Sequence, residues 1–173
     1  MELVLRTPQA EAALAAIASE VDGMLVGAGT VLSVAQAERA VAAGAKFLVA
    51  PGTNPKVVKW ATEHRVPMIP GVATATEVEA AMELGLTHLK FFPAEAAGGP
   101  KTLAAISAPY KGIRWMPTGG VSAANMGGYL ALKSVLAVGG SWLVPAKALK
   151  EKDYAAVEAL TRAAVQAAAT SRG

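Results

Sequence analysis

The chain has no cysteine among its 173 residues, only two histidines, and few aromatic or charged side chains, at 5% and 17% of the composition. The lack of cysteine excludes a disulfide framework, a thiolate nucleophile and any cysteine-ligated metal. With two imidazoles, a transition-metal site built from protein side chains is not expected either. The chain is instead rich in hydrophobic residues, which make up 53% and predict a large buried core.

Long apolar runs are also missing, because proline, glycine or a charged residue interrupts each one well before the roughly 18 residues of a membrane span. The N-terminus lacks the basic start and apolar core of a signal peptide. We therefore expect a cytoplasmic protein without a membrane partner. The 16 basic and 13 acidic residues give a net charge of +3 and are scattered, which favours a small anionic substrate over nucleic acid.

Short apolar runs alternate with segments of helical periodicity along the whole chain. The runs predict seven strands: Met1–Arg6, Met24–Gly27, Lys46–Ala50, Val66–Ile69, His88–Phe92, Ile113–Pro117 and Val135–Val138. The periodic segments predict helices over Pro8–Val21, Ser33–Ala43, Pro55–His64, Ala75–Leu84, Pro100–Ser107, Ala123–Leu132 and Asp153–Ala169. Apolar strands alternating with helices predict a parallel sheet covered by helices, in a single domain over residues 1–173.

A turn of small residues follows almost every predicted strand. These turns are Gly27–Thr30, Pro51-Gly52, Pro70-Gly71, Pro93, Thr118–Gly120 and Gly139–Ser141. Equivalent turns after equivalent strands favour a (β/α)8-type barrel over an open sheet, since barrel enzymes carry their functional residues at the C-terminal ends of the strands. A complete barrel typically needs about 250 residues. The length therefore predicts a barrel to which this chain contributes seven strands.

The strand His88–Phe92 carries the most informative residue, Lys90. Side chains alternate along a strand, so Leu89 and Phe91 would pack against helices while Lys90 points into the barrel. A lysine is rarely buried unless it is paired or functional. Desolvation would lower its pKa and favour the neutral amine that attacks a carbonyl to form a Schiff base. The alternative is a lysine that extends out of the barrel mouth into water.

Glu2 and Arg6 lie on one face of the first predicted strand, so both would enter the same interior as Lys90. The Arg6 guanidinium is suited to a substrate carboxylate, and Glu2 could move protons during chemistry at an imine. The alternative is a structural Glu2–Arg6 ion pair at the rim.

Two glycine pairs, Gly119-Gly120 and Gly139-Gly140, follow the last two predicted strands. Glycine lets a backbone approach an anion closely, and barrels often bind phosphate between these two loops. Two pairs in the two expected loops predict a phosphate site.

The strand-end motifs follow one another in a specific order and spacing: Glu2-x-x-x-Arg6-Thr7, VGAGTVL at Val26–Leu32, Pro51-Gly52, Pro70-Gly71, LKFFPAE at Leu89–Glu95, PTGG at Pro117–Gly120 and VGGSWLVP at Val138–Pro145. Together they closely resemble the 2-keto-3-deoxy-6-phosphogluconate (KDPG) aldolases, also called KHG/KDPG aldolases. The resemblance covers essentially the whole chain, and KFFPAE with PTGG is its most specific part.

The resemblance implies a class I aldolase that reversibly cleaves KDPG to pyruvate and glyceraldehyde 3-phosphate. It also implies action on 4-hydroxy-2-oxoglutarate, which would give pyruvate and glyoxylate. The family typically needs no metal or other cofactor and forms a homotrimer of (β/α)8 barrels. The implied setting is carbohydrate metabolism, in the Entner–Doudoroff pathway.

The resemblance also implies roles for individual residues. Lys90 would be the Schiff-base lysine and Glu2 the acid/base. The residues that would hold the pyruvate-derived carboxylate and neighbouring oxygens are Arg6, Thr30 and Thr118. The residues that would line the pocket are Pro51 and Phe92, and those that would bind the phosphate are Gly119, Gly120, Gly140 and Ser141.

Family members carry one further βα unit before the strand equivalent to Met1–Arg6, so we expect the first of eight units to be absent here. A truncated or misassigned start, a redesign, and a second polypeptide that supplies the unit all stay open as explanations. The absence also leaves open a weak or inactive barrel that serves as an oligomeric assembly scaffold. A phosphate-binding barrel of different chemistry would leave Lys90 and Arg6 unexplained.

Overall fold

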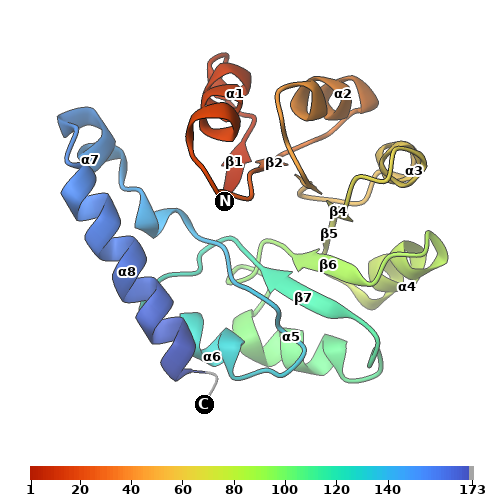
Figure 1. The fold of residues 1–173 in the computed structure, drawn as a ribbon. Coiled ribbons are helices and arrows are strands. Elements are labelled where there is room, and N and C mark those ends of the chain that lie inside the picture. Colours follow the sequence, from red (N-terminus) through yellow and green to blue (C-terminus); the bar gives the residue numbers. More distant parts are fainter. Residues whose placement is uncertain (172–173) are drawn as a thin grey trace. The chain divides into compact units, whose positions relative to one another are not determined.

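A computed structural model describes residues 1–171 as an α/β chain in which strands and helices alternate (Figure 1). The chain divides into two compact units, Met1–Lys90 and the residues from Phe91 onward. The single domain expected over residues 1–173 stays a prediction, and its last two residues lie outside the described part.

The first unit is built on a four-stranded parallel sheet. Its strands are β1 (Glu2–Val4), β2 (Gly27–Gly29), β3 (Leu48–Val49) and β4 (Met68–Ile69), and they pair in sequence order. Glu2 lies opposite Gly27, and Leu48 pairs with both Ala28 and Met68. Parallel neighbours in sequence order are what repeated βα units produce.

Four helices cover the strands of the first unit (Figure 1). They are α1 (Ala10–Glu20), α2 (Val34–Ala42), α3 (Pro55–Glu63) and α4 (Ala75–Glu83). The start of α2 is fixed by Ser33, whose hydroxyl accepts from Gln36 N–H, and that of α3 by the Asn54 side chain, which accepts from Lys56 N–H. These side chains satisfy N–H groups that have no partner inside the helix.

The core of the first unit combines aliphatic side chains with alanines. Leu14, Leu48 and Val57 are fully buried, and so are Ala37 on α2 and Ala61 on α3. Alanine at helix positions facing a sheet lets the helix approach closely. The low aromatic content therefore does not prevent a closed core.

Two strand predictions in the first unit need correction. Of the predicted strand Val66–Ile69 only Met68–Ile69 forms a strand, β4, and a further short strand, β5 (Gly71–Val72), follows Pro70, where a turn was predicted. Pro70 has no N–H to donate to a ladder, but its carbonyl accepts from Lys90 N–H at 2.8 Å. The strand predicted at Met24–Gly27 is displaced to Gly27–Gly29, where the backbone is buried.

The second unit begins within β6 (His88–Phe91), since the boundary falls after Lys90. The Phe91 carbonyl accepts from Thr118 N–H at 3.0 Å, directly after β7 (Arg114–Pro117). Trp115 and Phe91 are fully buried and meet edge to face, with ring centroids 6.5 Å apart. Aromatic side chains are thus among the fully buried core residues of this unit.

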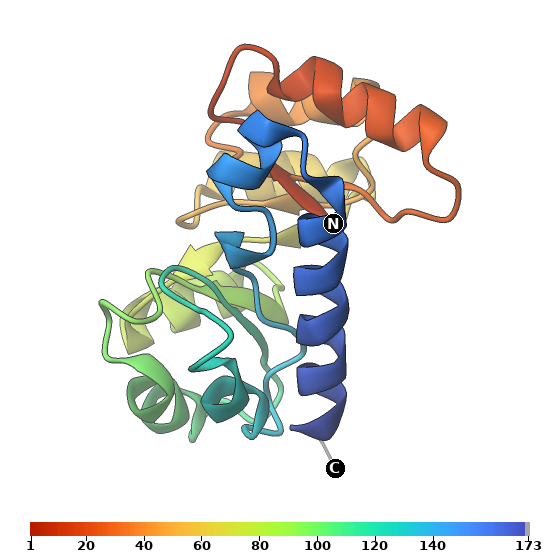
Figure 2. The same cartoon turned by 90° about the vertical axis from the view of Figure 1, so that its left-hand side faces the viewer.

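The remaining elements of the second unit are α5 (Gly99–Ser107), α6 (Met126–Leu130), a 3-10 turn η1 (Ser141–Leu143), α7 (Ala146–Glu151) and α8 (Tyr154–Thr170). The long helix α8, blue in Figure 2, contacts α6, α7 and η1. The sequence did not predict α7. No helix within residues 1–171 combines the length and hydrophobicity needed to cross a bilayer.

The last predicted strand, Val135–Val138, is reduced to isolated parallel bridges that join Trp115 to Val135 and Thr118 to Gly139. The described residues contain seven strands, the number expected. Their identities differ, however, because β5 was not predicted and the last predicted strand is only bridged.

Candidate active site

Lys90 is buried at the end of the first unit. Its side chain projects from β6, the residue is 7% exposed, and its Nζ lies 3.5 Å from Glu2 Oε1. The amine is therefore withdrawn from water, and the alternative of a lysine reaching into solvent is wrong. As the strand periodicity predicted, Lys90 and Glu2 face the same interior of this unit.

Burial lowers the pKa of Lys90 below its usual value, because a charged ammonium loses solvation in the protein interior. The Glu2 carboxylate opposes this by favouring the charged form, whereas the positive charge of Arg6 lowers the pKa further. The net effect is a lowered pKa, which leaves a larger share of neutral, nucleophilic amine than an exposed lysine has.

Glycine at position 29 makes room for the Glu2 carboxylate. A Cβ added to Gly29 would overlap Glu2 Oε1 and lie 2.8 Å from Cδ. The Glu2 side chain therefore lies directly against the backbone of the neighbouring strand, which holds the carboxylate beside Lys90. This explains a glycine within the buried strand β2, where the residue would otherwise weaken packing.

Arg6 and Thr30 form a second pair in the first unit. Arg6 Nε donates to Thr30 Oγ1 at 3.3 Å. Thr30 has φ of 64°, a left-handed conformation that is rare for a β-branched residue and typical of functional sites. Among the ion pairs of residues 1–171, Glu2 pairs with Lys90 and not with Arg6. The alternative of a Glu2–Arg6 rim pair is therefore wrong.

Pro51 packs against the turn after Pro70. Its carbonyl occupies the space that a Cβ of Gly71 would need, and Thr53 Oγ1 donates to Gly71 O at 3.1 Å. Two of the proline-glycine turns predicted at strand ends are thus packed together within the first unit.

Thr118 brings a buried hydroxyl to the second unit. The residue is 7% exposed, and among residues 1–171 its Oγ1 has no hydrogen-bond partner. An unsatisfied buried hydroxyl costs about 1–3 kcal/mol, so such groups are rare outside sites that bind a ligand or water. Phe91, whose carbonyl receives the Thr118 N–H, follows Lys90 directly in the chain.

The Gly119-Gly120 turn has a backbone that favours glycine, with φ of 92° and 82°. A Cβ on Gly119 would lie 3.1 Å from the Phe92 ring, so this ring borders the turn. Within the described chain, the N–H groups of Gly119 and Gly120 donate to no protein acceptor. Unpaired N–H groups on a glycine turn are suited to an anion.

The second glycine turn lies next to the first. The bridge between Thr118 and Gly139 joins them, and a Cβ on Gly139 would lie 2.8 Å from Thr118 Cγ2. Gly140 is extended and packs under the Trp142 ring, and Ser141 begins η1. The two predicted phosphate-binding turns are thus brought together within the second unit.

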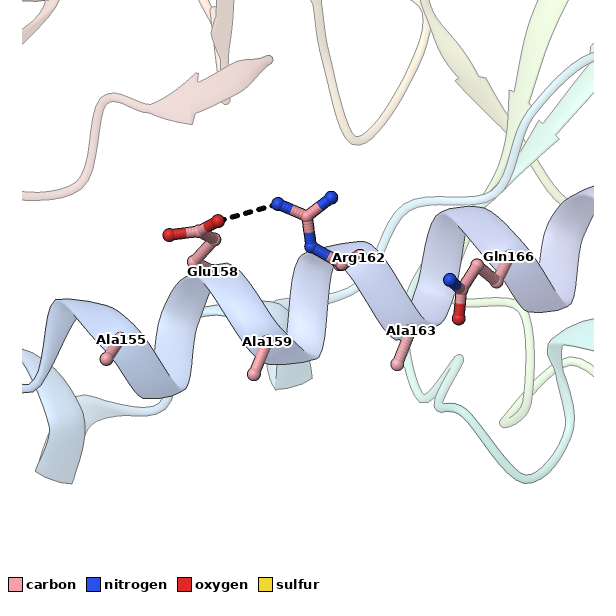
Figure 3. Close-up of a pocket in the computed structure, with 6 residues that line it drawn as sticks. All are labelled: Ala155, Glu158, Ala159, Arg162, Ala163 and Gln166. Atoms are coloured by element: carbon pink, nitrogen blue, oxygen red, sulfur yellow. Dashed lines mark hydrogen bonds and ion pairs between the residues drawn. The ribbon is translucent and has the colours of Figure 1, made fainter.

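Two hollows occur elsewhere. One, of about 320 Å³ in the first unit, is lined by Thr53, Pro55, Gly71, Glu77, Ala80, Glu83 and Leu84. The other, of about 380 Å³, is lined only by residues of α8 (Figure 3): Ala155, Glu158, Ala159, Arg162, Ala163 and Gln166. Its charged residues, Glu158 and Arg162, pair at 2.7 Å. Neither hollow contains a predicted site residue, and residues 1–171 hold no cluster of three acidic or histidine side chains suited to a metal.

Sequence reasoning missed a cluster beside the first glycine turn. The Tyr129 hydroxyl donates to Glu95, and the Asn125 amide donates to Gly120 O at 3.0 Å. Glu95 ends the motif that begins at Lys90, which was the available signal. Tyr129 and Asn125 lie on or beside α6 and carry no pattern that links them to this turn.

A desolvated lysine amine beside a carboxylate, within a strand of a parallel α/β fold, is the arrangement expected of an enzyme that forms a Schiff base with a carbonyl substrate. The family model described as "KDPG and KHG aldolase" matches residues 1–160. The KHG/KDPG aldolase of Escherichia coli (strain K12) is 51% identical over 168 residues, which cover 97% of this chain and 79% of that protein. The chain therefore belongs to the KDPG and KHG aldolase family.

Solved structures agree with this membership. The 2-keto-3-deoxy-6-phosphogluconate aldolase of Zymomonas mobilis ZM4, determined with 3-phosphoglycerate, is 40% identical with a TM-score of 0.89 and covers 94% of this chain and 76% of that one. The KDPG aldolase from Legionella pneumophila, with pyruvate captured as a covalent carbinolamine intermediate, is also 40% identical with a TM-score of 0.89. The match covers 92% of this chain and 77% of that one. The predicted α/β fold class of the (β/α)8-barrel type is confirmed.

Proposed function

We propose that this chain is a class I aldolase that cleaves KDPG to pyruvate and glyceraldehyde 3-phosphate through a Schiff base on Lys90. The observation that carries the proposal is the buried Lys90 amine, with its lowered pKa, 3.5 Å from the Glu2 carboxylate. The pyruvate carbinolamine in the Legionella relative supports it, since a carbinolamine is the adduct that loses water to become an imine.

In the proposed reaction the neutral Lys90 amine attacks the C2 carbonyl of the substrate. Glu2 delivers the proton that lets the carbinolamine lose water, which leaves a protonated imine. Removal of the proton from the C4 hydroxyl then breaks the C3–C4 bond. Its electron pair moves toward the imine nitrogen, giving an enamine and free glyceraldehyde 3-phosphate. Protonation at C3 and hydrolysis release pyruvate and restore the amine.

The other predicted residues would bind the substrate. Arg6 and Thr30, already paired, would hold the carboxylate, and the unpartnered hydroxyl of Thr118 is suited to a neighbouring oxygen. Pro51 and Phe92 would line the pocket. The phosphate would be bound by the turns that contain Gly119, Gly120, Gly140 and Ser141, whose unpaired N–H groups support this role.

The proposal extends to a second substrate and to the setting of the enzyme. The name of the Escherichia coli relative supports action on 4-hydroxy-2-oxoglutarate, which would give pyruvate and glyoxylate. The family resemblance supports a cytoplasmic homotrimer that acts in the Entner–Doudoroff pathway without a metal or other cofactor.

Borohydride reduction in the presence of pyruvate tests the proposal. We expect a stable pyruvate-derived adduct on the peptide that contains Lys90, found by mass spectrometry, and its loss in Lys90→Arg. Lys59→Arg is the matched control, because Lys59 is a solvent-exposed lysine on α3. Absence of an adduct at Lys90 would overturn the proposal. A stable assembly in sedimentation with neither adduct nor cleavage would favour the scaffold alternative instead.

A further inference from the structure

The carbonyl oxygens of the Thr118–Gly120 turn all have donors in the second unit. Ala94 N–H donates to Thr118 O at 2.8 Å, Glu95 N–H to Gly119 O at 3.0 Å, and the Asn125 side chain to Gly120 O. Because three successive carbonyls already accept hydrogen bonds, the turn presents chiefly its N–H groups to a ligand, beside the Thr118 hydroxyl. Its shape depends on the segment that carries Glu95 and on the residues that hold that segment.

Glu95 is held against this turn by its side chain as well as its backbone. A Cβ added to Gly120 would lie 2.7 Å from both Cβ and Cγ of Glu95, so the stem of the side chain lies directly on Gly120. A Cβ on Gly99 would lie 3.4 Å from Glu95 Oε1 and 3.8 Å from the Tyr129 oxygen. Glycine at 120 thus leaves space for the stem of Glu95, and Gly99 lies next to the place where its carboxylate meets Tyr129.

Tyr129 anchors the other end of this contact. It projects from α6, its side chain is fully buried, and its hydroxyl donates to Glu95 Oε1. Burial raises the pKa of Tyr129, and the hydrogen bond to Glu95 raises it further, so the hydroxyl keeps the proton that it donates. A hydrogen bond from a buried, immobile donor to an exposed carboxylate restricts where the carboxylate can go.

The position of this carboxylate matters because it lies beside a turn that presents N–H groups. A free glutamate side chain is itself a strong acceptor for backbone N–H groups and would repel a phosphate dianion. The hydrogen bond to Tyr129 keeps the Glu95 carboxylate from binding the N–H groups of the turn, while the stem of Glu95 packs against Gly120.

We infer that Glu95 and Tyr129 form a positioning pair that shapes the Thr118–Gly120 turn for the substrate's phosphate group and keeps the Glu95 carboxylate from competing for it. The inference rests on the proposed function, because it assumes that a phosphorylated substrate binds this turn. Neither residue is expected to touch the reacting carbons, so the pair should affect binding of the phosphate more than the chemical step.

Kinetics with two substrates test the pair in the full chain. In Tyr129→Phe we expect KM for KDPG to rise roughly five- to tenfold, with kcat changed less than about twofold. Both constants for 4-hydroxy-2-oxoglutarate, which has no phosphate, should stay within about twofold of the parent. Inhibition by inorganic phosphate should weaken by the same factor as KM for KDPG rises.

Glu95 variants provide the second measurement in case Tyr129→Phe folds poorly. Glu95→Gln keeps an oxygen that accepts from Tyr129, so its KM for KDPG should stay close to that of the parent. Glu95→Ala removes the acceptor, so its KM for KDPG should rise as in Tyr129→Phe. The double variant with Tyr129→Phe should be no worse than the poorer single variant, since both remove one interaction. Tyr110→Phe, which removes a hydroxyl elsewhere in the second unit, is the matched control.

The two proposals fail in different ways. If borohydride with pyruvate gives no adduct at Lys90 in the parent chain, the proposed function fails. If the adduct forms but KM rises equally for both substrates, or changes for neither, the positioning pair is overturned. A selective rise for KDPG that Glu95→Gln largely avoids supports it.

Discussion

Lys90 Nζ lies 3.5 Å from Glu2 Oε1, with both side chains largely withdrawn from water. The contact has two opposite effects on the amine, since burial favours the neutral form and the carboxylate favours the charged one. With its pKa set by these two effects, the Lys90 amine can lose its proton and attack a carbonyl. The Glu2 carboxylate is close enough to exchange a proton with it directly.

Lys90→Met is expected to abolish cleavage of KDPG while leaving the fold intact. The thioether fills a similar volume but cannot form an imine, so kcat/KM should fall by at least about 1,000-fold. Steady-state kinetics and circular dichroism on the same sample measure both effects. Residual activity near the parent level would contradict the assignment of Lys90.

Glu2→Gln is expected to slow turnover while leaving the Lys90 amine able to react. The amide fills the same space but cannot exchange protons, so kcat should fall by about 100-fold or more. Borohydride trapping with pyruvate should slow as well, because Glu2 supplies the proton for loss of water from the carbinolamine, but the adduct should still form on Lys90. Because the carboxylate raises the pKa of Lys90, its removal should move the limb over which the trapping rate rises with pH to lower pH. A limb shifted to higher pH would contradict this.

Gly29→Ala is expected to impair catalysis, although Gly29 lies on β2, the strand next to the one that carries Glu2. The new methyl would displace the Glu2 carboxylate from Lys90, so kcat should fall about 10- to 100-fold. Gly112→Ala is the control, since a Cβ there meets nothing within 4 Å. Equal activities of the two variants would show that the position of Glu2 does not matter.

The stability of the fold should depend on the ionisation of Lys90. Its pKa is lowered from the usual 10.5 in the folded chain, so between the two values the unfolded state binds more protons. The free energy of unfolding of the parent relative to Lys90→Met should therefore rise with pH through that window. Below the lowered pKa the difference should be constant. Urea unfolding at a series of pH values measures it, and a difference that falls with rising pH would contradict the lowered pKa.

The sequence predicted those parts of the site that depend on local pattern. The alternation along His88–Phe92 predicted that Lys90 faces inward, and the glycine pairs predicted two turns that the Thr118–Gly139 bridge does join. The helix starts at Ser33 and Asn54 followed from residues that cap helices.

Other features depend on contacts between distant residues, which no local pattern contains. The hydrogen bond from Tyr129 to Glu95 spans 34 positions. The unpredicted strand β5 begins directly after Pro70, whose carbonyl accepts from the N–H of the distant Lys90. The strand predicted at Val135–Val138 is only bridged, through Val135 to Trp115 of β7.

The left-handed conformation of Thr30 has a consequence for the evolution of this chain. A β-branched residue at φ of 64° costs about 1–3 kcal/mol relative to a conformation that it prefers. Glycine would relieve that cost but would remove the hydroxyl that accepts from Arg6. Laboratory selection for thermal stability alone should therefore replace Thr30 early, whereas selection that also demands turnover should retain it. The substitutions that separate two such populations would identify which strained positions are kept for chemistry.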